Sequence, residues 1–84
     1  RMVINAPVTL FQRQQVLEGV CRDLSANGMG VEVNEHGFAL APPIRVSLAT
    51  SSNLLPPFEA QARIVRVLEE EGGLLLALEF LPLT

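Results

Sequence analysis

The sequence predicts an all-β fold, a small six-stranded antiparallel barrel. Six segments alternate apolar and polar residues as half-buried strands do, at spacings of roughly ten residues. No stretch repeats its apolar residues with the period of a helix. The chain has 84 residues, of which 49% are hydrophobic and 18% charged, so it can form one core and no second domain. Short strands around a single core favour a closed barrel.

The strands are expected over residues 8–13, 16–22, 29–33, 44–49, 60–68 and 74–81. The short polar link between the first two makes them a hairpin, and the acidic EEEGG segment at 69–73 joins the last two. A loop is expected over 50–57. The 60–68 strand is apolar on different faces at its two ends, which we attribute to barrel twist. The expected core residues are Ile44, Val46, Leu48, Ile64, Leu76, Leu78 and Phe80.

Two further segments have distinct expectations. Residues 1–6 show no period of their own and are interpreted as an arm leading into a barrel of residues 7–84. This arm is expected to be mobile without ligand and ordered with it. Cys21 is the single cysteine and stands in an apolar strand, so it is predicted to be a buried free thiol rather than a nucleophile.

The candidate functional residues gather in the turn between the second and third strands, DLSANG. Asp23, Ser25 and Asn27 can each fold back on the backbone, while Gly28 and Gly30 permit positive φ or close approach by another group. Two interpretations stay open from composition alone. The turn either satisfies its own polar groups or presents a concave patch of donors and acceptors to a ligand.

The order of these residues resembles a family signature. DLSANG fits the pattern Asp-x-Ser-x-x-Gly, which is similar to the motif of the PilZ domain, the bacterial receptor module for cyclic di-GMP. Arg1 stands where the second arginine of the family's upstream Arg-x-x-x-Arg motif is expected, and the sequence does not contain the first arginine. The resemblance covers nearly all of the chain and implies a six-stranded, split-barrel-like fold. The family's C-terminal helix is absent or trimmed, and we interpret the chain as a single domain excised from a longer protein.

The resemblance also implies a binding site for cyclic di-GMP made by Arg1, Asp23, Ser25 and Gly28, with Asn27 and Arg22 as weaker candidates. Arg1 can pair with guanine O6 and N7, stack on the base or hold a phosphate. Asp23 can accept hydrogen bonds from the N1–H and N2–H donors of guanine, and the Ser25 hydroxyl can add one bond. Gly28 would let the backbone approach the ligand.

Charge and residue inventory argue against other classes of function. The net charge is −3, which disfavours general binding to DNA or RNA. A triad of Asp23, Ser25 and His36 can be written down, but no motif orients it, so no enzyme is predicted. His36 with its neighbouring glutamates is more typical of a solvated turn than of a metal site. No cofactor is expected.

The expected partner is an attached or separate effector that controls exopolysaccharide synthesis, biofilm formation, motility or another output. The sequence has no signal-peptide pattern and no apolar run long enough to cross a bilayer, so a cytoplasmic location is expected, including that of a cytoplasmic domain of a membrane protein. The alternative function is a degenerate PilZ barrel that binds no nucleotide and acts as a protein–protein interaction module.

Overall fold

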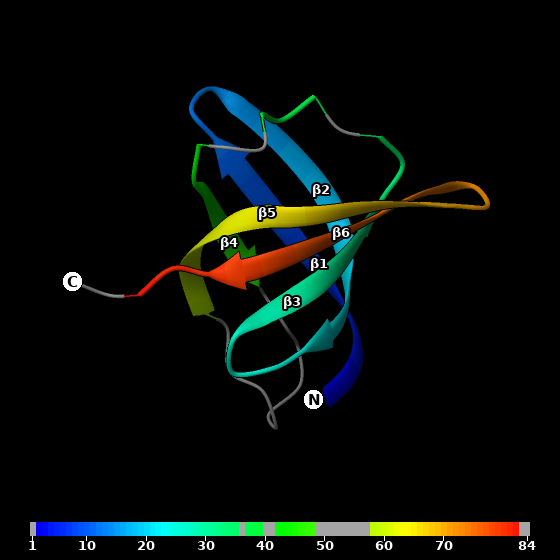
Figure 1. The fold of residues 1–84 in the computed structure, drawn as a ribbon, viewed down its shortest axis with the longest axis horizontal. Helices are drawn as coiled ribbons and strands as arrows, with labels where there is room; N and C mark the ends of the chain where they lie inside the picture. Colours follow the sequence, from blue (N-terminus) through cyan, green and yellow to red (C-terminus); the bar gives the residue numbers. More distant parts are fainter. Residues whose placement is uncertain (1, 36, 40–41, 49–57, 83–84) are drawn as a thin grey trace.

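The computed structural model describes residues 2–35, 37–39, 42–48 and 58–82, and it contains six β-strands (Figure 1). The loop expected over 50–57 lies outside these residues. In chain order the strands are β1 (Met2–Gln12), β2 (Gln15–Leu24), β3 (Gly28–Val33), β4 (Ile44–Leu48), β5 (Phe58–Glu70) and β6 (Gly73–Phe80).

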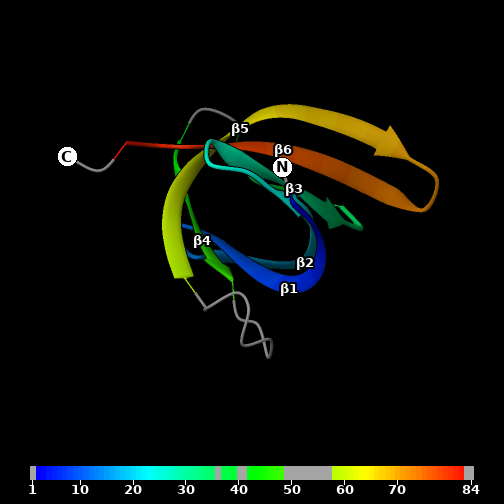
Figure 2. The same cartoon turned by 90° about the horizontal axis from the view of Figure 1, so that it is seen from below.

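The strands form a closed antiparallel barrel in the order β1-β2-β3-β6-β5-β4, and the pairing of β4 with β1 closes it. The predicted fold class is therefore confirmed. The β1–β2 hairpin turns at Arg13 and Gln14, and Arg13 has a φ of 56° in this turn. The β5–β6 hairpin extends past the other strands in both ribbon views (Figures 1 and 2). Its outer half therefore stands beside the barrel rather than around its core.

The N-terminal segment differs from the expected arm. From Met2 onward it is the first part of β1, in which Met2 pairs with Leu24 and Val3 with Asp23. The weak periodicity has a local cause, because the β1–β2 register shifts between Val3 and Ala6. A register shift adds a residue to one strand and obscures the pattern of period two from which strands are recognised. Arg1 lies outside the described residues.

The core contains the residues that face inward from all six strands. Six of the seven predicted core residues are buried, and Phe80 is half-buried and packs against them. The first three strands and the segment before β4 also contribute to the core, through Ala6, Val8, Leu10, Cys21, Met29, Val31, Val33 and Phe38. Ala62 completes it from β5. The core is thus built of apolar side chains, most of them aliphatic.

One buried polar residue, Gln12, ties the segment before β4 to the end of β1. Its Nε2 donates to the carbonyl oxygens of Ala39 and Pro42 at 2.8 and 3.2 Å, and its Oε1 accepts from the Ala39 N–H at 2.9 Å. A buried amide is tolerated when its donors and acceptor are paired in this way. The three bonds hold Ala39 and Pro42 against the end of β1, and Phe38 next to them is buried.

β5 changes face at a bulge. Ile64 pairs with Leu78 and Arg66 with Ala77, so Val65 is an extra residue between them. Ala62 and Ile64 point inward before the bulge, whereas after it Val67 packs against the core and Arg66 is exposed. The change of apolar face predicted for this strand is confirmed, but its cause is an inserted residue and not the gradual twist that we expected.

Gly28 of β3 lies tightly against the backbone of β6. A Cβ on this residue would lie 1.9 Å from the carbonyl oxygen of Leu78, a backbone atom of the neighbouring strand. Such a contact can be relieved only by moving one strand away from the other. The φ of Gly28 is not positive, so the requirement for glycine here comes from close packing of the barrel.

We expect Gly28→Ala to destabilise the fold, because the added methyl group forces β3 and β6 apart. The expected loss in the free energy of unfolding is about 1–3 kcal/mol or more, the range for overpacking. Urea denaturation measures it. Gly37→Ala is the matched control, since a Cβ there meets no atom within 4 Å. Equal stability of the two variants would contradict this account.

Cys21 is a buried thiol, as predicted. Its side chain is fully buried, and its Sγ donates to the Asp23 carbonyl oxygen at 3.3 Å. Burial, with a smaller contribution from the negative charge of Asp23, raises the pKa of Cys21 from 9.0 to about 11, against the opposing effect of the hydrogen bond. The thiolate is therefore disfavoured in the folded barrel.

This shift predicts a specific pH dependence of stability. The chain contains no tyrosine and no lysine. Cys21 is therefore the only side chain with a normal pKa between 8 and 10. Because the pKa of Cys21 is higher in the folded state, the protonated thiol stabilises the fold. This stabilisation is fully present below the pKa of Cys21 in the unfolded chain, and it is lost as the pH rises through about 11.

Urea denaturation at intervals from pH 8 to 11 should show the free energy of unfolding fall by up to about 1.4 kcal/mol per pH unit above pH 9. Cys21→Ala is the control, since its stability should not fall in the same way. A parallel decline in both proteins would show that Cys21 is not the cause.

Candidate functional site

A bulge in β2 presents Asp23 on the outer surface. Cys21 pairs with Val31 and Asp23 with Gly30, so Arg22 is an extra residue between them. Two residues apart on a regular strand, Cys21 and Asp23 would share the inner face. The inserted residue breaks this alternation: Cys21 and Leu24 pack in the core, while Asp23 is half-exposed outside it. The carboxylate thus escapes burial in an aliphatic core.

The bulge in β5 acts in the same way on Arg66, and the two bulges bring the two charged residues into one row. On neighbouring strands, Asp23 pairs with Gly30, Gly30 with Ala77 and Ala77 with Arg66. The row continues on the other side of Asp23 to Val3, which is 81% exposed. Between the carboxylate and the guanidinium the row contains only a glycine and an alanine.

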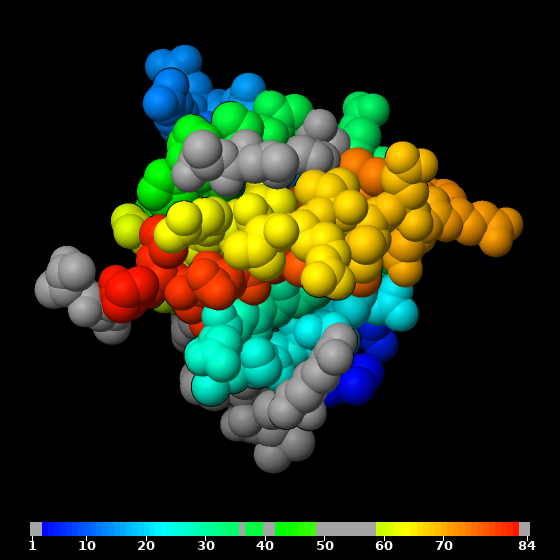
Figure 3. Space-filling view, in the orientation of Figure 1, coloured from blue at the N-terminus to red at the C-terminus, as the bar shows by residue number. Residues whose placement is uncertain are grey.

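An open groove of about 410 Å³ follows this row across the outer face. The space-filling view shows the face on which it lies, with the side chains of β5 on one side and the β2–β3 turn on the other (Figure 3). The residues that line the groove are Asp23, Ser25, Asn27, Gly28, Met29, Gly30, Val65, Arg66, Leu68, Leu75, Ala77, Leu78 and Glu79.

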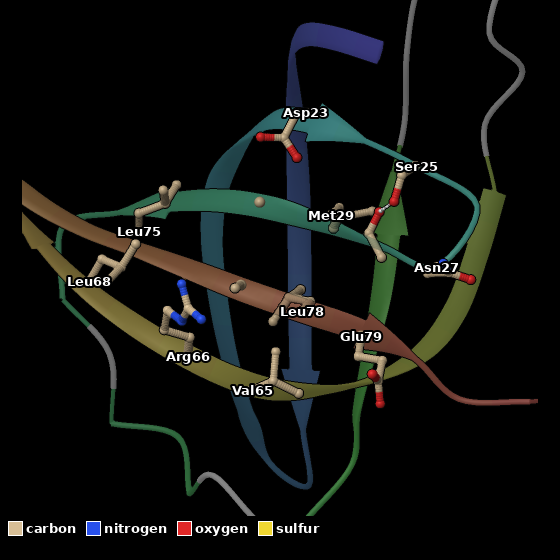
Figure 4. Close-up of a pocket in the computed structure, with 13 residues that line it drawn as sticks. Asp23, Ser25, Asn27, Met29, Val65, Arg66, Leu68, Leu75, Leu78 and Glu79 are labelled. Carbon is tan, nitrogen blue, oxygen red and sulfur yellow. Dashed lines mark hydrogen bonds between the residues drawn. The ribbon is translucent and has the colours of Figure 1, made fainter. Parts of the chain in front are cut away.

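Gly30 gives the Asp23 carboxylate its place in the groove. A Cβ on Gly30 would lie 3.2 Å from Oδ2 and 3.4 Å from Oδ1 of Asp23. The first of these distances is tighter than nearly all real Cβ contacts, so a side chain here would push the carboxylate aside. Without it, the carboxylate lies close to Gly30, and Figure 4 shows Asp23 on β2 next to β3.

The β2–β3 turn is held by its own polar groups and by β6. The Ser25 N–H and hydroxyl both donate to the Gly28 carbonyl oxygen, at 2.9 and 3.3 Å. The Phe80 N–H donates to the Asn27 carbonyl oxygen at 2.7 Å, which fastens the turn to the end of β6. Both interpretations of the turn therefore have structural support: the turn is partly self-satisfied, and it also forms one end of a groove.

The structure brings together four of the six predicted site residues. Asp23, Ser25, Asn27 and Gly28 all line the groove, although the missing Cβ of Gly28 serves the packing of β3 on β6 and not only the approach of a ligand. Arg1 lies outside the described residues, as does His36.

Arg22, the sixth predicted residue, forms an exposed ion pair with Glu32 at 2.9 Å on the neighbouring strand. It lines a separate depression next to Asp23, together with Val3, Asn5, Glu70 and Leu75. Its guanidinium is therefore held away from the groove that contains the DLSANG residues.

The sequence prediction missed Arg66. This arginine is the only cationic side chain among the described residues that line the groove, and within the described part of the chain it forms no ion pair. Its position depends on the Val65 bulge and on the pairing of β6 between β3 and β5. The one available signal was the change of apolar face within 60–68, which indicates a bulge as well as a twist.

No group of three or more metal-binding side chains is found among the described residues. The same residues include no helix with the length and apolarity needed to span a bilayer.

A comparison with known protein families identifies the family of this chain. The family model for the PilZ domain matches residues 1–84, the whole chain. No curated protein matches the sequence. The barrel with six antiparallel strands agrees with the fold that this family predicts. The chain therefore belongs to the PilZ domain family, a family of cyclic di-GMP receptor modules and not of catalysts.

Proposed function

We propose that this domain binds cyclic di-GMP at the groove beside the DLSANG turn and passes the signal to an attached or partner protein. The observation that carries the proposal is the Arg22 bulge, which exposes the Asp23 carboxylate in the same groove as Ser25, Asn27 and Gly28. Bulges next to functional sites commonly re-aim a side chain in this way. Neither a catalytic step nor a cofactor is part of the proposal.

The groove suits one guanine of the ligand. The Asp23 carboxylate accepts from the N1–H and N2–H donors, a pairing that adenine cannot reproduce because it lacks both. The base then lies over Gly30, where no side chain obstructs its face. The Ser25 hydroxyl, which is exposed and makes a long bond of 3.3 Å to Gly28, can turn to donate to the ligand.

Arg1 is proposed to complete the site from the N-terminal end of β1. Met2 pairs with Leu24 and Val3 with Asp23, so Met2, the residue that follows Arg1 in the sequence, lies next to the β2–β3 turn. An arginine there can reach the base or a phosphate of the ligand. Ordering of the chain around Arg1 on binding would change how the domain meets whatever it regulates. The proposed setting is cytoplasmic, with control of exopolysaccharide synthesis, biofilm formation or motility.

One observation favours the alternative, a barrel that binds protein instead of nucleotide. Val65 and Leu68 line the groove and are 55% and 42% exposed, and Val3 at the end of the same row is 81% exposed. Exposed aliphatic side chains beside a groove are typical of an interaction surface. The two functions differ in whether the wild-type domain binds the nucleotide.

We expect Asp23→Ala to abolish or strongly weaken binding of cyclic di-GMP, because the guanine donors lose their acceptor. A charged hydrogen bond contributes about 1.5–3 kcal/mol, which corresponds to a loss of roughly tenfold or more in affinity. Isothermal titration calorimetry measures the affinity. A thermal melt provides a second readout, since ligand at about 100 times its Kd should stabilise the wild-type domain by about 2.7 kcal/mol.

Glu18→Ala is the matched control, because Glu18 is an exposed carboxylate on the same strand and lies outside the groove. It should bind like wild type. An Asp23→Ala variant that folds and still binds normally would overturn the proposed site. Absence of binding by the wild-type domain would instead support the interaction module.

A further inference from the structure

We propose that Arg66 binds a phosphate of the ligand whose guanine pairs with Asp23. The inference rests on the proposed function, and it adds a binding residue on β5 that lies outside the signature motif. The observation behind it is the row of Asp23, Gly30, Ala77 and Arg66 across four neighbouring strands. Two bulges place the charged residues at its two ends.

The row has the dimensions of a nucleotide site. Neighbouring strands lie about 4.8 Å apart, so the three steps from Asp23 to Arg66 span roughly 14 Å between backbones. Both side chains shorten this span. The Asp23 carboxylate lies close to Gly30 of β3, and Figure 4 shows the Arg66 guanidinium pointing toward β6. The floor between them consists of Gly30 and Ala77, so nothing larger than a methyl group rises there.

The structure of guanosine determines the direction in which a base paired with Asp23 points its ribose. The N1–H donor lies across the six-membered ring from C4, and C4 carries N9, to which the ribose is attached. A guanine whose N1–H and N2–H face Asp23 therefore directs its ribose and phosphate away from Asp23. Along the row, that direction leads over Ala77 to Arg66. The proposed orientation of the base thus brings its phosphate toward the guanidinium.

Charge supports this assignment. Asp23 and Glu79 both line the groove, and Arg66 is the one cationic residue among the described residues that do so. An anionic dinucleotide would be repelled by the two carboxylates unless a cation compensates for its phosphate. The Arg66 guanidinium has no ion pair within the described residues, so it remains available to form a bidentate pair with phosphate oxygens.

The variant Arg66→Met tests the proposal, because it removes the charge and keeps an unbranched apolar side chain beside Val65 and Leu68. Arg63→Met is the matched control. Arg63 is an exposed arginine on the same strand before the bulge, and it does not line the groove. Both variants should retain the circular dichroism spectrum and melting temperature of the wild-type chain, since both side chains are exposed.

Isothermal titration calorimetry with cyclic di-GMP should show a loss of affinity of about tenfold or more for Arg66→Met and wild-type affinity for Arg63→Met. Guanosine, which lacks the phosphate, distinguishes a phosphate contact from a base contact. In NMR titrations, guanosine should shift the Gly30 and Asp23 amide signals equally in the wild type and in Arg66→Met.

The other possible results contradict the role of Arg66, the phosphate contact or the proposed function. Equal affinities of Arg66→Met and Arg63→Met for cyclic di-GMP, with Asp23→Ala still impaired, would overturn the role of Arg66 and leave the proposed function intact. Loss of the guanosine shifts in Arg66→Met would overturn the phosphate assignment, because Arg66 would then contact the base. Failure of the wild-type chain to bind cyclic di-GMP would overturn the proposed function and this inference together.

Discussion

The alternation of side chains along each strand is the constraint on which this barrel and its site depend. A strand residue faces either the core or the solvent, and its neighbour two positions away shares its face. A closed barrel of 84 residues has little interior space, and aliphatic side chains fill it. A charged residue two positions after an inward-facing residue would therefore face the core as well. It can face the solvent only if the strand contains an extra residue at that point. The extra residues at Arg22 and Val65 meet this condition for Asp23 and for the change of face in β5.

The two bulges place a core residue and a groove residue close together on one strand. Cys21 and Ile64 are buried in the barrel, and Asp23 and Arg66, two residues after each of them, line the groove on its outside. A single inserted residue in each strand permits both placements, at the loss of local ladder pairing. Gly28 and Gly30 have related roles on β3. The first allows β3 to approach β6, and the second leaves room for the Asp23 carboxylate above the sheet.

The motif residues stabilise the β2–β3 turn and also line the candidate groove. Ser25 and Gly28 close the turn through the Gly28 carbonyl, and Asn27 connects it to β6. These bonds fasten the turn at one end of the groove that Asp23 and Ser25 line. For the proposed site, a turn already held in this way reduces the entropy lost on binding.

The sequence by itself determined the strands, most of the core and the turn that carries the DLSANG motif, because each depends on local alternation or on residues adjacent in the chain. Ile44, Val46 and Leu48 show this in five consecutive residues. It did not reveal the strand at residues 2–6, where a register shift hides the period, or the place of Arg66. Arg66 and Asp23 are 43 residues apart in the sequence, and they fall in one row only because Gly30 of β3 pairs with Ala77 of β6. Long-range strand pairing sets that neighbourhood, and no local pattern contains it.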